Sequence, residues 1–183
     1  VEATRMLKTL GVVEVYVGSG VPSHSRGCLS ERRFGSQSLL EWVTRRMTDA
    51  LLLEHVVVIA CGDDFARQIS RRVPSDVSVF SASDPPDPVG NFASALRFYD
   101  ADAAVRVTLD NPFVDPVLID RLVARAESYR YCDYMSYCSA RGKPALMAKI
   151  GVLAEWCKAR AVYRADELAS NSEERSDVCR FLH

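Results

Sequence analysis

The stretch AAVRVTLDNPFVDPVLID, residues 103–120, joins a strand, a turn and the start of a helix. Apolar Val105, Val107 and Leu109 alternate with polar Arg106, Thr108 and Asp110, which is typical of a β-strand. Pro116 stands where proline suits the first turn of a helix, and the apolar periodicity continues from it over 116–128. We therefore predict a strand and a helix, with Asp110 at the carboxyl end of the strand.

Similar segments alternate along the rest of the chain. HVVVIAC at 55–61 is almost wholly apolar and β-branched, as in a strand that a parallel sheet buries on both faces. The predicted strands are 11–18, 55–61, 77–82, 103–109 and 132–138. The predicted helices are 39–51, capped by Ser38 or Ser36, then 63–73, 91–100, 116–128 and most of 151–183, with a polar break at Asn171 to Glu174. This alternation predicts an α/β fold with a mostly parallel, doubly wound sheet in one domain over 1–183.

The composition excludes some classes of function. The 183 residues carry a net charge of −1, so no basic field exists to hold a nucleic-acid backbone or an anionic membrane. No apolar run reaches the length of a membrane span, and the N-terminal VEATRMLKTLG does not resemble a signal peptide. We therefore expect a cytoplasmic protein whose six cysteines are reduced and mostly buried.

Asp110 is the first candidate for a functional residue. In open α/β sheets, ligands bind beyond the carboxyl ends of the strands, and a carboxylate there can hold Mg²⁺ together with substrate phosphates. The sequence leaves an alternative open, because Asp110, Asn111 and Pro112 can equally form an Asx-type turn that ends the strand. Asp115 before Pro116 is interpreted as a helix N-cap.

The loop 18–36, rich in glycine and serine, is the second candidate. Its backbone N–H groups can meet phosphates, and arginines near its end add positive charge. The loop lacks the spacing of a P-loop, so it can also be a plain connection. Arg106 shares a strand face with Asp110 and either touches a substrate or pairs with a neighbouring acid.

The stretch VRVTLDNPFVDPVLID resembles the segment "VRxTGDxPLIDPxLID" of the cytidylyltransferase family, which includes CMP-KDO synthetases, acylneuraminate cytidylyltransferases and SpsF-like proteins. DPVGNFASALRFYDADAAVRV at 87–107 is similar to the family's approach to the same strand, and HVVVIACGDDFARQI at 55–69 to its second strand and helix. EERSDVCRFLH at 173–183 is similar to a late family stretch. The resemblance covers nearly the whole chain and is most specific over 105–120.

The resemblance implies a Rossmann-like, three-layer nucleotide-diphospho-sugar transferase fold, often dimeric. The implied activity moves CMP from CTP onto an acidic sugar in surface-polysaccharide biosynthesis, with Mg²⁺ as cofactor. Asp110 is the implied metal ligand, and the predicted substrate contacts are Arg106 and Asn111. The loop overlays the family's nucleotide-binding motif, so the predicted nucleotide-binding residues are Gly18, Ser19, Gly20, Arg26 and Cys28. The chain ends at His183, before the family's late "Dxxed" segment.

Several departures from the family motifs favour an alternative. Cys28 falls at the Lys that clamps the phosphates, Asn91 replaces an Arg, and Leu109 replaces the Gly before the metal ligand, adding bulk beside the metal. Loss of one such charged donor commonly costs about 10²–10³ in rate. The alternative is a catalytically weak or inactive nucleotide-binding or scaffold module of the same fold.

Overall fold

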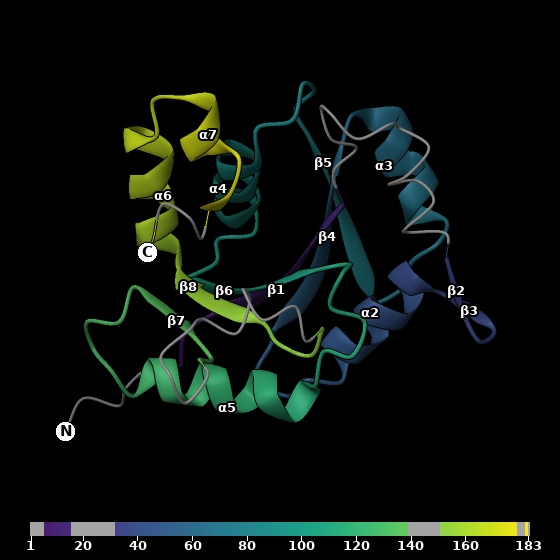
Figure 1. Cartoon of the computed structure of the whole chain (residues 1–183), viewed down its shortest axis with the longest axis horizontal. Coiled ribbons are helices and arrows are strands. Elements are labelled where there is room, and N and C mark those ends of the chain that lie inside the picture. Colours follow the sequence, from purple (N-terminus) through teal and green to yellow (C-terminus); the bar gives the residue numbers. More distant parts are fainter. Residues whose placement is uncertain (1–5, 16–31, 139–150, 179–181, 183) are drawn as a thin grey trace.

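The computed structural model describes residues 6–15, 32–138, 151–178 and 182 (Figure 1). The main-sheet strands are β1 (Thr9–Val15), β4 (His55–Cys61), β5 (Val77–Ala82), β6 (Ala103–Thr108), β7 (Tyr134–Ser136) and β8 (Glu155–Lys158). A separate hairpin consists of β2 (Arg33–Phe34) and β3 (Gln37–Ser38). The helices are α2 (Leu39–Thr48), α3 (Asp63–Ser70), α4 (Pro88–Phe98), α5 (Pro116–Glu127), α6 (Ala159–Leu168) and α7 (Ser172–Arg175).

The main sheet has six strands in the order β5-β4-β1-β6-β8-β7. The first four are parallel to one another, and β8 runs antiparallel to both β6 and β7. The sheet is therefore mostly parallel, and the predicted fold class is confirmed.

Helices cover both faces of the sheet (Figure 1). Buried residues of α2, α3 and α5 pack against one face, and those of α4 and α6 pack against the other. The reason is visible in α2, where Leu40, Val43 and Met47 recur at helical spacing and are fully buried. Ser38 begins this helix by accepting a hydrogen bond from the backbone N–H of Glu41 at 3.1 Å, which confirms it as the cap.

The prediction for the C-terminal part was wrong at one element. Residues Glu155–Lys158 form a strand between β6 and β7, not a helix. Trp156 faces the α5 side of the sheet and Cys157 the α4 side, so both faces of this strand are buried. The predicted polar break at Asn171 to Glu174 contains the N-cap and most of the short helix α7. Asn171 caps this helix by accepting a hydrogen bond from the backbone N–H of Glu174 at 2.9 Å.

The strand order places a topological switch point between β1 and β6. From β1 the chain moves outward through β4 and β5, then returns to the other side of β1 to form β6. Helix α4, on the opposite face from α2 and α3, makes this return. Connections that leave neighbouring strands in opposite directions open a crevice at their carboxyl ends. Asp110 follows β6 at this point of the sheet.

Two further expectations can be compared with the structure. Of the four cysteines within the described residues, Cys61 and Cys157 are buried, Cys132 is half-buried and Cys138 is exposed, and all four are free thiols. Among the described residues, every helix is too short or too polar to cross a lipid bilayer.

Candidate functional site

The turn after β6 presents the Asp110 carboxylate to solvent. Its Oδ1 accepts hydrogen bonds from the Thr108 hydroxyl and, at 3.1 Å, from the side-chain amide of Asn111. The Asn111 amide also donates to Thr108 Oγ1 at 2.9 Å, and the Asn111 backbone N–H donates to the Thr108 carbonyl at 3.0 Å. A turn therefore ends the strand, and these contacts orient the carboxylate without burying it. It is not an Asx turn at Asp110, because the residue two positions on, Pro112, has no backbone N–H to donate.

Two neighbouring segments hold this turn in place. The indole N–H of Trp42 on α2 donates to the carbonyl of Pro112 at 2.6 Å, and Arg46, one helical turn later, donates to the carbonyl of Val114. From the other side, the backbone N–H of Phe113 donates to the carbonyl of Gly151 at 2.8 Å. The position of Asp110 therefore depends on α2 and on residue 151 as well as on β6.

Gly151 has a backbone conformation that requires glycine. Its φ is +72°, and a Cβ atom there would lie 3.3 Å from Pro112 Cδ and 3.5 Å from the carbonyl oxygen of Asp110. A larger residue would therefore be strained and would press on the turn that carries the carboxylate.

Asp115 confirms its interpretation as a helix cap. Its Oδ1 accepts hydrogen bonds from the backbone N–H groups of Val117 at 2.8 Å and Leu118 at 3.3 Å, at the start of α5. Leu109, expected to add bulk beside a metal, has its side chain in the hydrophobic cluster with α2 and α5 and is 6% exposed. That expectation was wrong, because odd and even positions of a strand point to opposite faces.

The turn offers one protein ligand to a Mg²⁺ ion, the carboxylate of Asp110. Asp110 Oδ2 accepts no hydrogen bond from the described residues, so one carboxylate oxygen remains available. The described residues contain no group of three or more His, Cys, Asp or Glu side chains that could enclose a metal. One carboxylate suffices for Mg²⁺ when water and substrate phosphates complete its shell. The donor set therefore suits a metal that arrives with a nucleotide.

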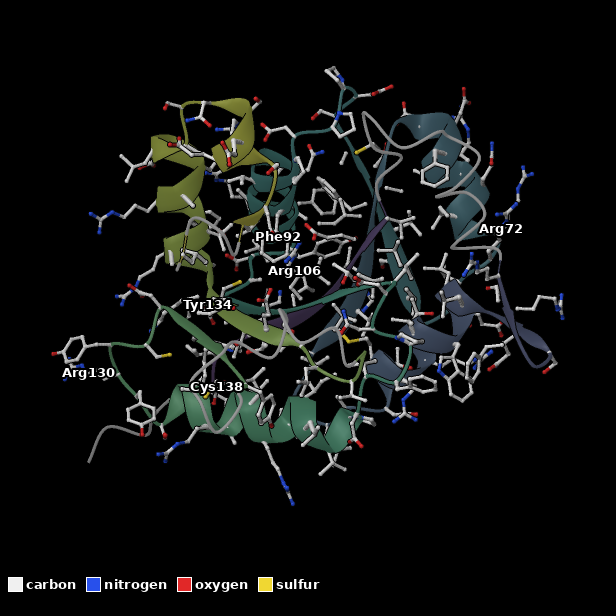
Figure 2. All side chains as sticks on the ribbon, in the orientation of Figure 1. Arg72, Phe92, Arg106, Arg130, Tyr134 and Cys138 are labelled. Carbon is white, nitrogen blue, oxygen red and sulfur yellow. The ribbon has the colours of Figure 1, made fainter. Side chains whose placement is uncertain are left out.

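Arg106 lies inside the sheet, in a cluster of buried charges (Figure 2). Its Nε donates to Glu14 Oε2 at 2.5 Å, and its NH1 group lies 3.1 Å from Glu155 Oε2 and 3.2 Å from Asp177 Oδ1. Tyr134 donates its hydroxyl hydrogen to Glu155 Oε1 at 2.5 Å. Pairing with acids, one of the two sequence interpretations, is what the structure shows, and contact between Arg106 and a substrate stays a prediction.

A second polar group lies at the carboxyl ends of β4 and β5. Asn91 on α4 is 3% exposed, and its Oδ1 accepts the hydroxyl hydrogen of Ser83 at 2.7 Å. Its amide nitrogen lies 3.5 Å from the sulfur of Cys61. Burial, and then the charge of Asp84, raise the pKa of the Cys61 thiol to about 11. Asn91, which replaces the family's Arg, therefore contacts the ends of both β4 and β5 and is buried between them.

The remaining predicted site residues lie outside the part of the chain that the structure describes. They are Gly18, Ser19, Gly20, Arg26 and Cys28. Their roles toward a nucleotide stay predictions.

Sequence reasoning missed residues that the structure brings to the switch point. Glu14 is the only charge in the apolar run GVVEV, and that isolation is a signal of a paired or functional group. Trp42 reads as an ordinary helix residue, since nothing local links it to a carbonyl 70 positions away.

The sequence matches a known protein family. Residues 30–176 match the MobA-like NTP transferase domain family, so the chain belongs to that family. No curated protein matches the chain at a significant level.

Solved structures of nucleotidyltransferases share the fold. A cytidylyltransferase from Leptospira borgpetersenii serovar Hardjo-bovis superposes with a TM-score of 0.76 at 19% identity, covering 97% of this chain and 70% of that one. CMP:2-keto-3-deoxy-manno-octonic acid synthetase in complex with CTP gives a TM-score of 0.66 at 11% identity, over 96% and 84% of the two chains. A 4-diphosphocytidyl-2C-methyl-D-erythritol synthase gives 0.59 at 16% identity, over 96% and 85%. The expected nucleotidyltransferase fold is thus confirmed, while these identities leave the substrate open.

Proposed function

We propose that this protein is a Mg²⁺-dependent cytidylyltransferase that transfers CMP from CTP to an acidic sugar and releases pyrophosphate. The observation that carries the proposal is the exposed, oriented carboxylate of Asp110 at the switch point of a nucleotidyltransferase fold. Ligands of such sheets bind at this place, and a carboxylate there matches the needs of a nucleotide that brings a metal.

The roles of the chain's residues follow from this assignment. Asp110 would hold the metal through its free oxygen, while Thr108 and Asn111 keep the carboxylate in one orientation. When bound, Mg²⁺ supplies charge stabilisation to the phosphates. The predicted loop residues between Gly18 and Cys28 would contact the nucleotide through backbone N–H groups and the charge of Arg26.

The transfer itself is an in-line displacement. An oxygen of the acceptor forms a bond to the α-phosphorus of CTP as the bond to the bridging oxygen of pyrophosphate breaks. The acceptor proton leaves to solvent or to a base, and the negative charge that builds up on the departing pyrophosphate needs cationic partners. An acidic sugar as acceptor, a role in surface polysaccharides and a homodimer rest on the sequence resemblance, and on the similarity of the fold to CMP:2-keto-3-deoxy-manno-octonic acid synthetase.

A second candidate function is a nucleotide-binding module with little or no turnover. Two residues favour it: Cys28 stands where the family carries a phosphate-clamping Lys, and Asn91 replaces an Arg. Asn91 is buried and engaged with Ser83, so it cannot take over a charged role. Such a module would bind CTP with Mg²⁺ but would not release pyrophosphate when acidic sugars are offered.

Thermal unfolding with 1 mM CTP, with and without Mg²⁺, tests the shared part of both candidates. A Kd of about 1 μM would stabilise the protein by roughly 4 kcal/mol. We expect this stabilisation to require Mg²⁺ and to disappear in Asp110→Ala. Asp76→Ala is the matched control, because Asp76 is also exposed but precedes β5 at the opposite edge of the sheet. An equal shift in Asp110→Ala and wild type would contradict the proposal. If the shift depends on Asp110, a pyrophosphate-release assay distinguishes an active enzyme from a nucleotide-binding module without turnover.

A further inference from the structure

A hollow of about 430 Å³ is lined by residues of the β2–β3 hairpin, of α2 and of the segment at the end of α3. Figure 2 shows Arg72 projecting next to α3. The residues that line the hollow are Arg33, Ser36, Ser38, Glu41, Arg45, Arg71, Arg72, Val73 and Pro74. None of them belongs to the turn after β6.

The lining carries a concentrated positive charge. Four of its nine residues are arginines, contributed by the hairpin, by α2 and by the segment after α3. Its single acid, Glu41, is already paired with Arg45 at 3.2 Å. Arg33 and Arg71 form no ion pair with any of the residues that the structure describes. The formal charge of the lining is therefore +3 in a chain whose net charge is −1.

Local helix electrostatics explain only part of this arrangement. Arg71 is the C-cap of α3, where a cation interacts favourably with the helix dipole. Arg33 lies on the hairpin, and its guanidinium donates to the Ser36 carbonyl, which turns it along the hairpin at the rim of the hollow. No helix end accounts for it, and like charges gathered around one cavity repel one another, a cost that a bound anion would relieve.

We propose that this hollow binds a small multivalent phosphate anion of the pyrophosphate class, at a site separate from the switch point. Guanidinium groups present forked N–H donors that match phosphate oxygens, and several forks around one cavity favour a multiply charged ligand. The volume lies in the range of small-molecule sites. The hydroxyl of Ser36 stands among the same lining residues and can donate a further hydrogen bond.

Isothermal titration with pyrophosphate in EDTA tests this site without involving the proposed catalytic one. Excess EDTA removes divalent metal, and the Asp110→Ala background removes the expected metal ligand, so binding at the switch point is suppressed. We expect wild type and Asp110→Ala to bind one pyrophosphate with equal affinity. In Arg33→Ser/Arg71→Ser the affinity should fall at least tenfold, because two charge-assisted contacts are lost.

Arg67→Ser is the matched control. Arg67 is exposed on α3, one turn before Arg71, and pairs with Asp64 outside the hollow, so its loss should leave the affinity within twofold of wild type. Arg71→Lys keeps the charge but loses the fork, and we expect an intermediate affinity. Circular dichroism melts of each variant establish that the compared proteins are folded.

Two results would overturn the proposal: no pyrophosphate binding to wild type in EDTA, or equal weakening by Arg67→Ser and by the double variant. A titration with CTP in EDTA identifies the source of the phosphate group. Equal affinities for CTP and pyrophosphate assign the site to a free polyphosphate group, and tighter CTP binding assigns it to a nucleotide tail. Because salt screens exposed charges, we expect the affinity for pyrophosphate to fall several-fold when NaCl is raised from roughly 50 to 200 mM.

Discussion

Arg106 and Asp110 stand four residues apart on one face of the same chain segment, yet their surroundings are opposite. Arg106 lies within β6, is 8% exposed and contacts three carboxylates. Asp110 lies beyond the strand end and is exposed, and within the described part of the chain its carboxylate contacts only a hydroxyl and an amide. A charge inside the sheet is thus satisfied by the fold, whereas a charge past its carboxyl edge keeps an oxygen for a ligand. The edge of the sheet separates a stabilising charge from a candidate functional one.

The largest effect on stability is expected from Arg106→Met. This substitution leaves Glu14 and Glu155 buried without their cation, which should cost about 3–5 kcal/mol of the free energy of unfolding. Urea denaturation measures the loss. Arg160→Met is the control, because the Arg160–Asp133 pair is more than half exposed and should cost less than about 1 kcal/mol. Equal costs for the two variants would show that the buried cluster does not stabilise β6.

Gly151→Ala should have the next largest effect. The left-handed backbone at φ +72° should cost about 1–2 kcal/mol, and the added Cβ should press on Pro112 and weaken CTP binding. Gly35→Ala is an informative control, since Gly35 has φ +63° but no atom of the described residues within 4 Å of the added Cβ. Both variants should lose stability, and only Gly151→Ala should lose affinity for CTP with Mg²⁺. Unchanged affinity in Gly151→Ala would mean that the turn does not position the site.

Trp42→Phe keeps an aromatic ring beside Phe34 but removes the hydrogen bond to the Pro112 carbonyl. We expect a loss of about 0.5–1.5 kcal/mol in urea denaturation. Because this bond holds the turn that carries Asp110, the affinity for CTP should also fall. A stability loss with no change in affinity would assign Trp42 to the fold alone.

A smaller effect on stability, confined to alkaline pH, is expected from Cys61 at the carboxyl end of β4. The pKa of Cys61 is raised to about 11 from an ordinary value of 9.0, so the folded state favours the neutral thiol. The resulting stability is complete below pH 9 and is lost as the pH rises through 11. The difference in unfolding free energy between wild type and Cys61→Ser should therefore be constant below pH 9 and shift against wild type above it. A constant difference up to pH 11 would contradict the raised pKa.

The sequence predicted the fold where its signals are local. The strands 55–61 and 77–82 have the predicted bounds. The first is an apolar β-branched run that ends at Gly62, and the second is a short run with Val77, Val79 and Phe80 that ends before the turn residues from Ser83. Glu155–Lys158 was missed because four residues carry no usable period, and its strand conformation comes from pairing with β6 and β7.

The candidate site was predictable only in part, for the same reason. Asp110 could be located from the strand that precedes it, and Asp115 from the proline that follows it. The partners of Arg106 lie 92 and 49 positions away, and the carbonyl that Trp42 holds is 70 positions away. Contacts at such separations depend on the assembled sheet, so the residues alone could not decide between substrate and acid for Arg106.

Titration of Mn²⁺ in the presence of CTP, followed by the electron paramagnetic resonance signal of free Mn²⁺, examines the role of Asp110 directly. Mn²⁺ prefers the same carboxylate and water oxygens as Mg²⁺ and reports its own binding. Asp110→Asn is the variant to compare with wild type, since it keeps the size of an exposed side chain and should change stability by less than about 0.5 kcal/mol. We predict a wild-type ternary complex that consumes free Mn²⁺ beyond the amount that CTP alone binds, and loss of this extra binding in Asp110→Asn. Equal Mn²⁺ consumption by the two folded proteins would contradict a metal site at the end of β6.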